Sequence, residues 1–270
     1  MTRKTKLYLA LAGLSVLFLL MLGVGIMWVT QGGLPLNLSD DPVFQERYDG
    51  VESVACALRS YAIEVRTWEG PDVEVSFYRW GLGGGELPET RVENGRLTVT
   101  EPWTLGLLLG GGKVVVQVPA GTAMPYELRT VSGSVKLDAP CTTAALETTS
   151  GSVKVYRSGA ALTARTVSGS IKVYEPFPAQ DLRTTSGSVK AAADAGTEEV
   201  RMQTVSGSIK LQLEGITGYR LEHHVTSGSV RDEYRNIRYE QDGTDTWGDG
   251  SLWIHASTIS GSIKLTDWGD

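Results

Sequence analysis

Polar and apolar residues in the C-terminal half of the chain alternate with the two-residue period of β-strands, and a short polar break recurs within this pattern. In residues 128–137, LRTVSGSVKL, the alternation reaches a Ser-Gly-Ser tripeptide and resumes after it. Ser132 and Val135 are three residues apart, so a continuous strand would point them to opposite faces. A corner at Gly133 would let both side chains point inward.

The tripeptide begins seven times, at intervals of 18, 18, 18, 20, 21 and 33 residues: at Ser132, Ser150, Ser168, Ser186, Ser206, Ser227 and Ser260. A unit of this length is typical of one coil of a parallel β-helix, which buries its apolar face only by stacking on neighbouring coils. A β-propeller would need ~40 residues per blade. The sequence therefore predicts an all-β fold, a right-handed parallel β-solenoid of Ser-Gly-Ser coils over residues 128–270. Seven coils would give a rod ~30 Å long.

Stacked coils place equivalent residues in ladders along the rod. The predicted inner ladder is Val135, Val153, Ile171, Val189, Ile209, Val230 and Ile263. The predicted corner ladder is Gly133, Gly151, Gly169, Gly187, Gly207, Gly228 and Gly261.

Residues 45–127 are also strand-like but less regular, with alternating runs at 51–58, 61–67, 73–80, 96–100 and 113–119. We interpret this region as irregular early coils that cap the start of the solenoid, because repeat proteins need atypical ends. The loop at residues 103–110 is unusually apolar. We expect it to pack under the cap, or alternatively to touch a bilayer or a partner.

The N-terminal segment predicts a single membrane span. Residues 7–29 carry no charge and are long enough to cross a bilayer as a helix. Three basic residues lie within residues 1–6, whereas residues 30–41 contain neither lysine nor arginine. The positive-inside rule then predicts a cytoplasmic tail at 1–6, a linker at 30–44 and an exported C-terminal domain in the cell membrane. A cleaved signal peptide is the alternative, although its apolar core would normally be shorter, and it would also export the domain.

Composition limits the classes of partner. The formal net charge is −6, and an acidic chain argues against nucleic acid. Thirty-two glycines against four phenylalanines favour many short strands and turns. Cys56 and Cys141 would be able to pair outside the cytoplasm, or they are two buried thiols; their spacing does not decide between these alternatives.

The second residue after each Ser-Gly-Ser is basic, which predicts an outward basic row along the rod: Lys136, Lys154, Lys172, Lys190, Lys210, Arg231 and Lys264. Adjacent like charges are mildly destabilising, so a row kept despite this cost suggests a polyanion ligand such as a wall polymer or anionic lipid head groups. The alternative is a solvated face that keeps strands from pairing wrongly.

Catalytic and metal-binding patterns are missing from the sequence. The acids within residues 242–250 match no calcium-loop spacing, and we interpret them as a turn of an inserted hairpin. His223, His224 and His255 have no zinc-site spacing, and no Gly-x-Ser-x-Gly elbow occurs. The sequence thus predicts a non-enzyme without cofactor or metal.

The repeated TxSGSVKL unit, the run VVVQVPAG at 114–121 and Gly248-Asp249-Gly250-Ser251 before the last repeat resemble the bacterial putative-adhesin families. The resemblance covers roughly residues 45–270 and implies an exported β-solenoid domain in the cell envelope, with no catalytic residues to carry over. Some relatives are thought to act in adhesion or envelope-stress sensing. We therefore expect an interaction module that contacts envelope polymers, another cell or a partner membrane protein, or alternatively a sensor that signals through such a partner.

Overall fold

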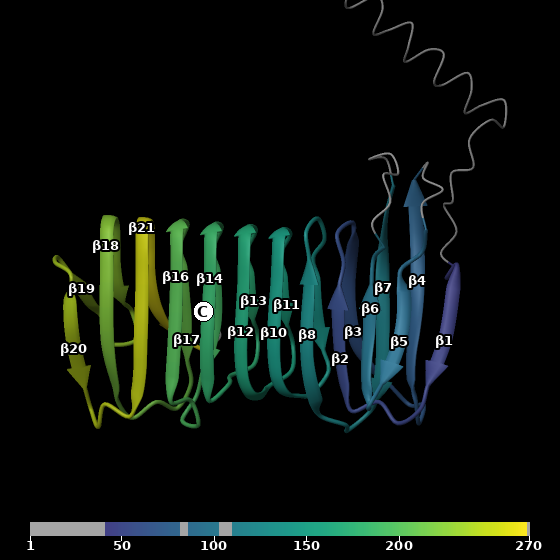
Figure 1. The fold of residues 1–270 in the computed structure, drawn as a ribbon. Coiled ribbons are helices and arrows are strands. Elements are labelled where there is room, and N and C mark those ends of the chain that lie inside the picture. The colour runs from purple at the N-terminus through teal and green to yellow at the C-terminus, as the bar shows by residue number, and fades with distance from the viewer. Residues whose placement is uncertain (1–40, 82–85, 103–109, 269–270) are drawn as a thin grey trace, which may run out of the picture.

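The computed structural model describes residues 41–81, 86–102 and 110–268, and these residues form an all-β rod (Figure 1). No helix occurs among them. The rod consists of two layers of one continuous, mostly parallel sheet, which the chain joins by a corner at each Ser-Gly-Ser and by turns at the opposite side. The fold is thus β-solenoid-like, as the alternation and the period indicate.

Layer I contains eleven strands. In spatial order they are β5 (Glu89–Glu93), β6 (Arg96–Thr100), β2 (Ser53–Ala57), β8 (Met124–Thr130), β10 (Cys141–Ser150), β12 (Gly159–Ser168), β14 (Ala179–Ser186), β16 (Glu199–Ser206), the first part of β21 (Leu252–Asp267), the first part of β18 (Tyr219–Asp232) and β20 (Gly243–Trp247).

Layer II lies behind it. Its strands are β1 (Phe44–Tyr48), β4 (Val73–Gly81), β7 (Gly110–Pro119), β3 (Tyr61–Trp68), β9 (Val135–Asp138), β11 (Val153–Val155), β13 (Ile171–Val173), β15 (Val189–Ala193), β17 (Ile209–Leu213), the second parts of β21 and β18, and β19 (Ile237–Tyr239).

The core lies between the layers and is built from the inner ladder that the sequence predicts. All seven of its members are at most 4 % exposed. Ile63 of β3 extends this ladder beyond Val135, with which it is in register. Ten spacings of ~4.8 Å across layer I give a rod about 48 Å long, which exceeds the expected ~30 Å because residues 53–119 add full coils.

At one of the seven corners Val225 stands two residues before Ser-Gly-Ser; at each of the other six this position holds a buried threonine that fixes the corner. Its hydroxyl Oγ1 donates a hydrogen bond to a backbone carbonyl of the neighbouring coil, as from Thr166 to Gly151 at 3.0 Å. The same ladder contains Thr130, Thr148, Thr166, Thr184, Thr204 and Thr258. The hydroxyls therefore satisfy carbonyl groups that the corner removes from the sheet's own ladder.

Glycine is required at the corner because neighbouring coils approach too closely for a side chain. A Cβ at Gly169 would overlap the carbonyl oxygen of Gly151, and its φ of +153° is one that other residues rarely adopt. The second serine adds a further link, since the backbone N–H of Ser152 donates to Ser134 Oγ at 3.2 Å. The interpretation of Ser132 as inward-facing is wrong. The chain already bends at this residue, so Ser132 is exposed while Thr130 is the last inward side chain of β8.

The coils do not stack in sequence order at either end of the rod. β21 lies between β16–β17 and β18, so the last coil of the chain is the penultimate coil of the rod (Figure 1). The expected ladder order, with Arg231 between Lys210 and Lys264, is therefore wrong: Lys264 is the middle one. The physical reason is that Ser260 matches both Ser206 and Ser227 in register, so equivalent coils can stack in either order.

Antiparallel strands close both ends of the rod. β5, β4 and β1 cover the coil formed by β6 and β7, which itself lies outside β2 and β3. At the other end, β19 and β20 cover β18. The sequence predicts a turn at residues 242–250, but most of these residues form β20, and only the segment after Trp247 turns.

Candidate functional site: a lysine-bearing face

The outer face of layer II carries the basic row of the sequence analysis. Lys136, Lys154, Lys172, Lys190 and Lys210 are consecutive register partners. Lys264 and then Arg231 continue the row. Because register partners in a parallel sheet lie ~4.8 Å apart, the row is a line of positive charge parallel to the rod axis.

Every lysine after Lys6 lies on this face. Lys113 on β7 is the seventh, and it is the register partner of Tyr78 on the neighbouring strand β4. Beyond residue 30 the remaining positively charged residues are all arginines, several of them on layer I. A chain with a net charge of −6 has thus separated its lysines onto one face, which forms a compact, strongly hydrated set of charges.

Carboxylates compensate the two ends of the row. Glu64 Oε1 lies 3.0 Å from Lys136 Nζ, and Glu64 Oε2 lies 3.4 Å from Lys113 Nζ. Burial alone would raise the pKa of Glu64, but the hydrogen bond from Lys136 and the charge of Lys113 outweigh it, so this pKa is lowered. The same hydrogen bond raises the pKa of Lys136. At the far end Lys264 Nζ lies 2.8 Å from Glu233.

The centre of the row has no such compensation. Lys154, Lys172 and Lys190 form no ion pair with any residue that the structure describes, and Lys154 and Lys172 are exposed. Two tyrosines stand beside them, two residues further along their strands: Tyr156 and Tyr174 stack with ring centroids 4.7 Å apart and an interplanar angle of 12°. Tyr174 is 38 % exposed. The centre of layer II is therefore cationic and bordered by aromatic rings.

Exposed apolar groups lie on the same face at the chain's entry to the rod. Trp80 near the end of β4 is 47 % exposed, and Val43 just before β1 is 41 % exposed. Extending the β1–β4 register places Val43 opposite Tyr78, whose partner on its other side is Lys113, and Lys113 Nζ lies 5.0 Å from the Tyr78 ring centroid. Phe77, on the opposite side of β4, is fully buried, so Tyr78 and Trp80 point outward.

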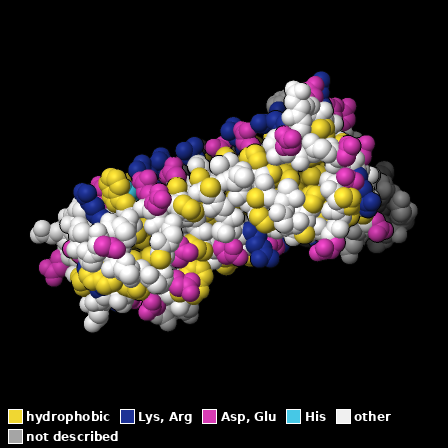
Figure 2. Space-filling view, turned by 90° about the horizontal axis from the view of Figure 1, so that it is seen from below, with side chains coloured by type: hydrophobic (Ala, Val, Ile, Leu, Met, Phe, Trp, Pro, Cys, Tyr) yellow, Lys and Arg dark blue, Asp and Glu magenta, His cyan; other side chains and the backbone are white. Residues whose placement is uncertain are grey.

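Layer I has a different outer surface, which the sequence analysis did not identify. Its arginines are paired: Arg165 Nη1 lies 3.6 Å from Glu147, and Arg183 Nε lies 2.8 Å from Asp181. Figure 2 shows basic and acidic side chains interspersed along one long edge of the rod. An exposed row of β-branched residues borders these pairs: Val131, Thr149, Val167, Thr185, Val205 and Ile259. The sequence contains a signal for this row, because each of these residues immediately precedes a Ser-Gly-Ser.

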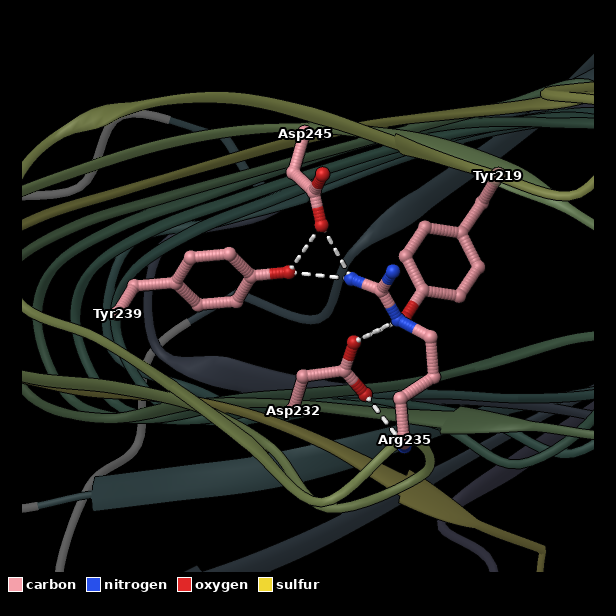
Figure 3. A network of polar contacts seen from close by, with 5 residues as sticks. All are labelled: Tyr219, Asp232, Arg235, Tyr239 and Asp245. Atoms are coloured by element: carbon pink, nitrogen blue, oxygen red, sulfur yellow. Dashed lines mark hydrogen bonds and ion pairs between the residues drawn. The ribbon is translucent and has the colours of Figure 1, made fainter.

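A largely buried polar network braces the capped end of the rod (Figure 3). Arg235 Nε donates to Asp232 Oδ2 at 2.7 Å and to Tyr219 Oη at 2.8 Å, and Tyr239 Oη donates to Asp245 at 2.7 Å. Burial and the nearby carboxylates raise the pKa values of Tyr219 and Tyr239. Tyr219 and Asp232 are fully buried, and the network joins β18, β19 and β20.

The three histidines lie close together at the capped C-terminal end of the rod, although their spacing in the sequence does not predict it. His223 and His224 on β18 lie next to β21, which carries His255. His224 pairs with Asp242, and His255 Nδ1 lies 3.0 Å from Glu222. Among the described residues, no three histidine, cysteine or acidic side chains are placed to share a metal ion.

The two cysteines are buried and unbonded. Cys56 on β2 lies opposite Leu128 of β8, and Cys141 on β10 lies opposite Met124 on the other side of β8. Two strand spacings (about 9.6 Å) and four residues along the strand (about 13 Å) therefore separate them, about 16 Å in all, whereas a disulfide needs Cα atoms within ~7 Å. They are therefore two buried thiols, and burial raises the pKa of Cys56 to about 12.

Fold and surface together define an all-β, coil-stacked protein with a lysine-bearing face on one layer. The chain belongs to the Toastrack DUF4097 family, which matches residues 124–266. Comparison with curated proteins found no match.

Solved structures similar to this chain include a putative lipid binding protein from Parabacteroides distasonis (14 % identity, TM-score 0.44, covering 84 % of this chain and 97 % of that one). A putative adhesin from Bacteroides fragilis is similar at 13 % identity and TM-score 0.41, covering 84 % and 98 %. A putative cell adhesion protein from Clostridium sporogenes is similar at 11 % identity and TM-score 0.35, covering 83 % and 99 %.

The described residues contain no helix long and apolar enough to cross a membrane. The predicted span at 7–29 and the apolar residues 103–109 lie outside the described residues.

Proposed function

We propose that this protein is a non-catalytic interaction module of the bacterial cell envelope. In this proposal residues 7–29 anchor it in the membrane, and a right-handed β-solenoid outside the membrane binds an anionic polymer or surface through the outer face of layer II. The observation that carries the proposal is the uncompensated centre of the lysine row, Lys154, Lys172 and Lys190.

Repulsion within the lysine row has a cost in free energy that a bound anion would relieve. Register partners of like charge repel one another, and this repulsion recurs along the row from Lys136 to Arg231. Solubility alone would be served by mixed charges, such as those on layer I, where Arg165 and Arg183 form ion pairs with acids. A linear polyanion along the rod would contact several lysines at once and relieve their repulsion.

Binding to polyphosphate, used as a probe for linear polyanions, tests the proposal. The full chain in a neutral detergent is compared with two variants that each lose three positive charges. One is K154Q/K172Q/K190Q on layer II, and the control is R129Q/R165Q/R183Q on layer I. We expect salt-sensitive binding that weakens roughly tenfold or more in the lysine variant, because each basic residue near an anionic surface contributes about 1 kcal/mol. Equal weakening in both variants would show that binding depends on the total positive charge and not on the lysine row, and would contradict the proposal.

A further inference from the structure

The structure shows where the chain outside the described residues joins the rod. The first described residue, Asp41, precedes β1, which pairs with β4 so that Phe44 lies opposite Phe77. Extending this register places residue 41 beside Trp80. The tether from the proposed membrane span therefore reaches the rod next to the exposed Trp80 and Val43, at the end of the face that carries the lysines.

The side chains of this face have the composition of a membrane interface. Tryptophan and tyrosine prefer the headgroup level of a bilayer, and lysines are attracted to anionic headgroups. Trp80 and Val43 lie at the tether, Tyr174 lies near the middle of the rod, and the lysine row runs from the tethered end past Tyr174 to the far end. A wall polymer would account for the lysines but not for exposed apolar groups beside the tether.

We infer that the anionic partner of the layer II face is the lipid surface of the chain's own membrane, on which the rod lies flat with Trp80 and the lysines against the headgroups. This inference rests on the proposed anchoring and on the proposed anion-binding face. It assigns the ligand chemistry, anionic phospholipid headgroups, and an orientation that the proposed function leaves open.

Distance separates the flat arrangement from an upright one. Five strand spacings lie between β1 and β11, so in a rod standing on its tethered end Lys154 would be about 24 Å further from the membrane than β1. Screening limits headgroup attraction to about 8 Å at physiological salt, and such a lysine would not sense lipid charge. Residues 30–40 span at most about 36–40 Å, which permits either arrangement, so lipid charge sensed at the middle of the row reports the flat one.

The rate of lysine acetylation measures how accessible this face is to solvent, because all described lysines lie on it. The full chain is reconstituted in nanodiscs of phosphatidylcholine alone or with roughly 30 mol % phosphatidylglycerol, the anionic component. We expect acetylation of Lys154, Lys172 and Lys190 to slow by about tenfold in the anionic discs and to recover in about 1 M salt. Hydroxyl-radical oxidation of Val167 and Ile259 on layer I is expected to stay unchanged.

A matched pair of tryptophan variants tests the apolar contact. Trp80→Ala is expected to reduce the protection of the lysines several-fold, whereas Trp253→Ala, a 42 % exposed tryptophan on layer I, is expected to leave it unchanged. Equal effects of the two substitutions would overturn the contact at Trp80.

The remaining outcomes separate this inference from the proposed function. Equal acetylation in the two kinds of nanodisc, with protection by added polyphosphate in neutral discs, would overturn the lipid assignment and leave the anion-binding face intact. Equal acetylation with no protection by polyphosphate would overturn both. Loss of the chain from the discs in alkaline carbonate would overturn the anchoring, and with it the inference.

Discussion

Replacing Thr166 by valine tests the physical basis of the repeat. The substitution keeps the shape of a buried side chain that is 5 % exposed and removes the hydroxyl that donates to the carbonyl of Gly151. No backbone N–H donates to this carbonyl within the described residues. Leaving a buried acceptor unsatisfied costs about 1–3 kcal/mol.

The assay is urea unfolding of the full chain in a neutral detergent, followed by circular dichroism. With an m-value of about 2 kcal/mol/M, the expected loss lowers the midpoint by about 0.5–1.5 M. Thr149→Val is the control, because Thr149 is exposed and stands in a row where Val131 and Val167 already occupy equivalent positions; a change within about 0.5 kcal/mol is expected. A Thr166→Val protein as stable as the wild type would refute the role of the hydroxyl ladder.

Three further perturbations follow from the structure. Gly169→Ala is expected to prevent stacking of its coil and to lower stability by more than about 3 kcal/mol, because its Cβ would overlap the Gly151 carbonyl. Gly243→Ala is the control and is expected to unfold like the wild type, because a Cβ at this position meets no atom within 4 Å. Thermal denaturation compares the two variants. Burial lowers the pKa of His223, against the opposing charges of Asp242 and Asp245, so the unfolded state binds the proton more readily and stability should fall as pH drops below about 6.5. His223→Phe should flatten this acid limb in urea titrations at pH 5 to 8, and an unchanged limb would assign it to other groups. Cys56 should react with a thiol reagent only on unfolding and should form no disulfide with Cys141 under oxidising conditions; mass spectrometry of the non-reduced protein would reveal a bond that contradicts this.

The sequence was sufficient to predict features that depend on register alone. Alternation across Ser-Gly-Ser places Val135 and its equivalents inside and Lys136 and its equivalents outside, and the structure has both arrangements. Ser132 was misassigned because strand parity was extended into the corner, where the backbone no longer follows a two-residue period.

The order of the coils was beyond the sequence pattern. Each Ser-Gly-Ser coil presents the same register to any neighbour, so the repeat does not encode which coil stacks on which. The interval of 33 residues between Ser227 and Ser260 indicated an insertion but not its path to the end of the rod and back. The brace around Arg235 joins Tyr219 and Asp232 of β18 with Tyr239 of β19 and Asp245 of β20, and these positions become adjacent only after the cap has folded.

The central claim is that the outer face of layer II is the contact face of this protein. The most direct test is the acetylation of Lys154, Lys172 and Lys190 in native membranes from cells that produce the full chain, compared with the purified protein in neutral detergent. The account predicts slower acetylation of these three lysines in the membranes, reversed by a high-salt wash that restores the rates of the purified protein. Equal rates in both samples, before and after the wash, would show that this face meets only solvent and would contradict the account.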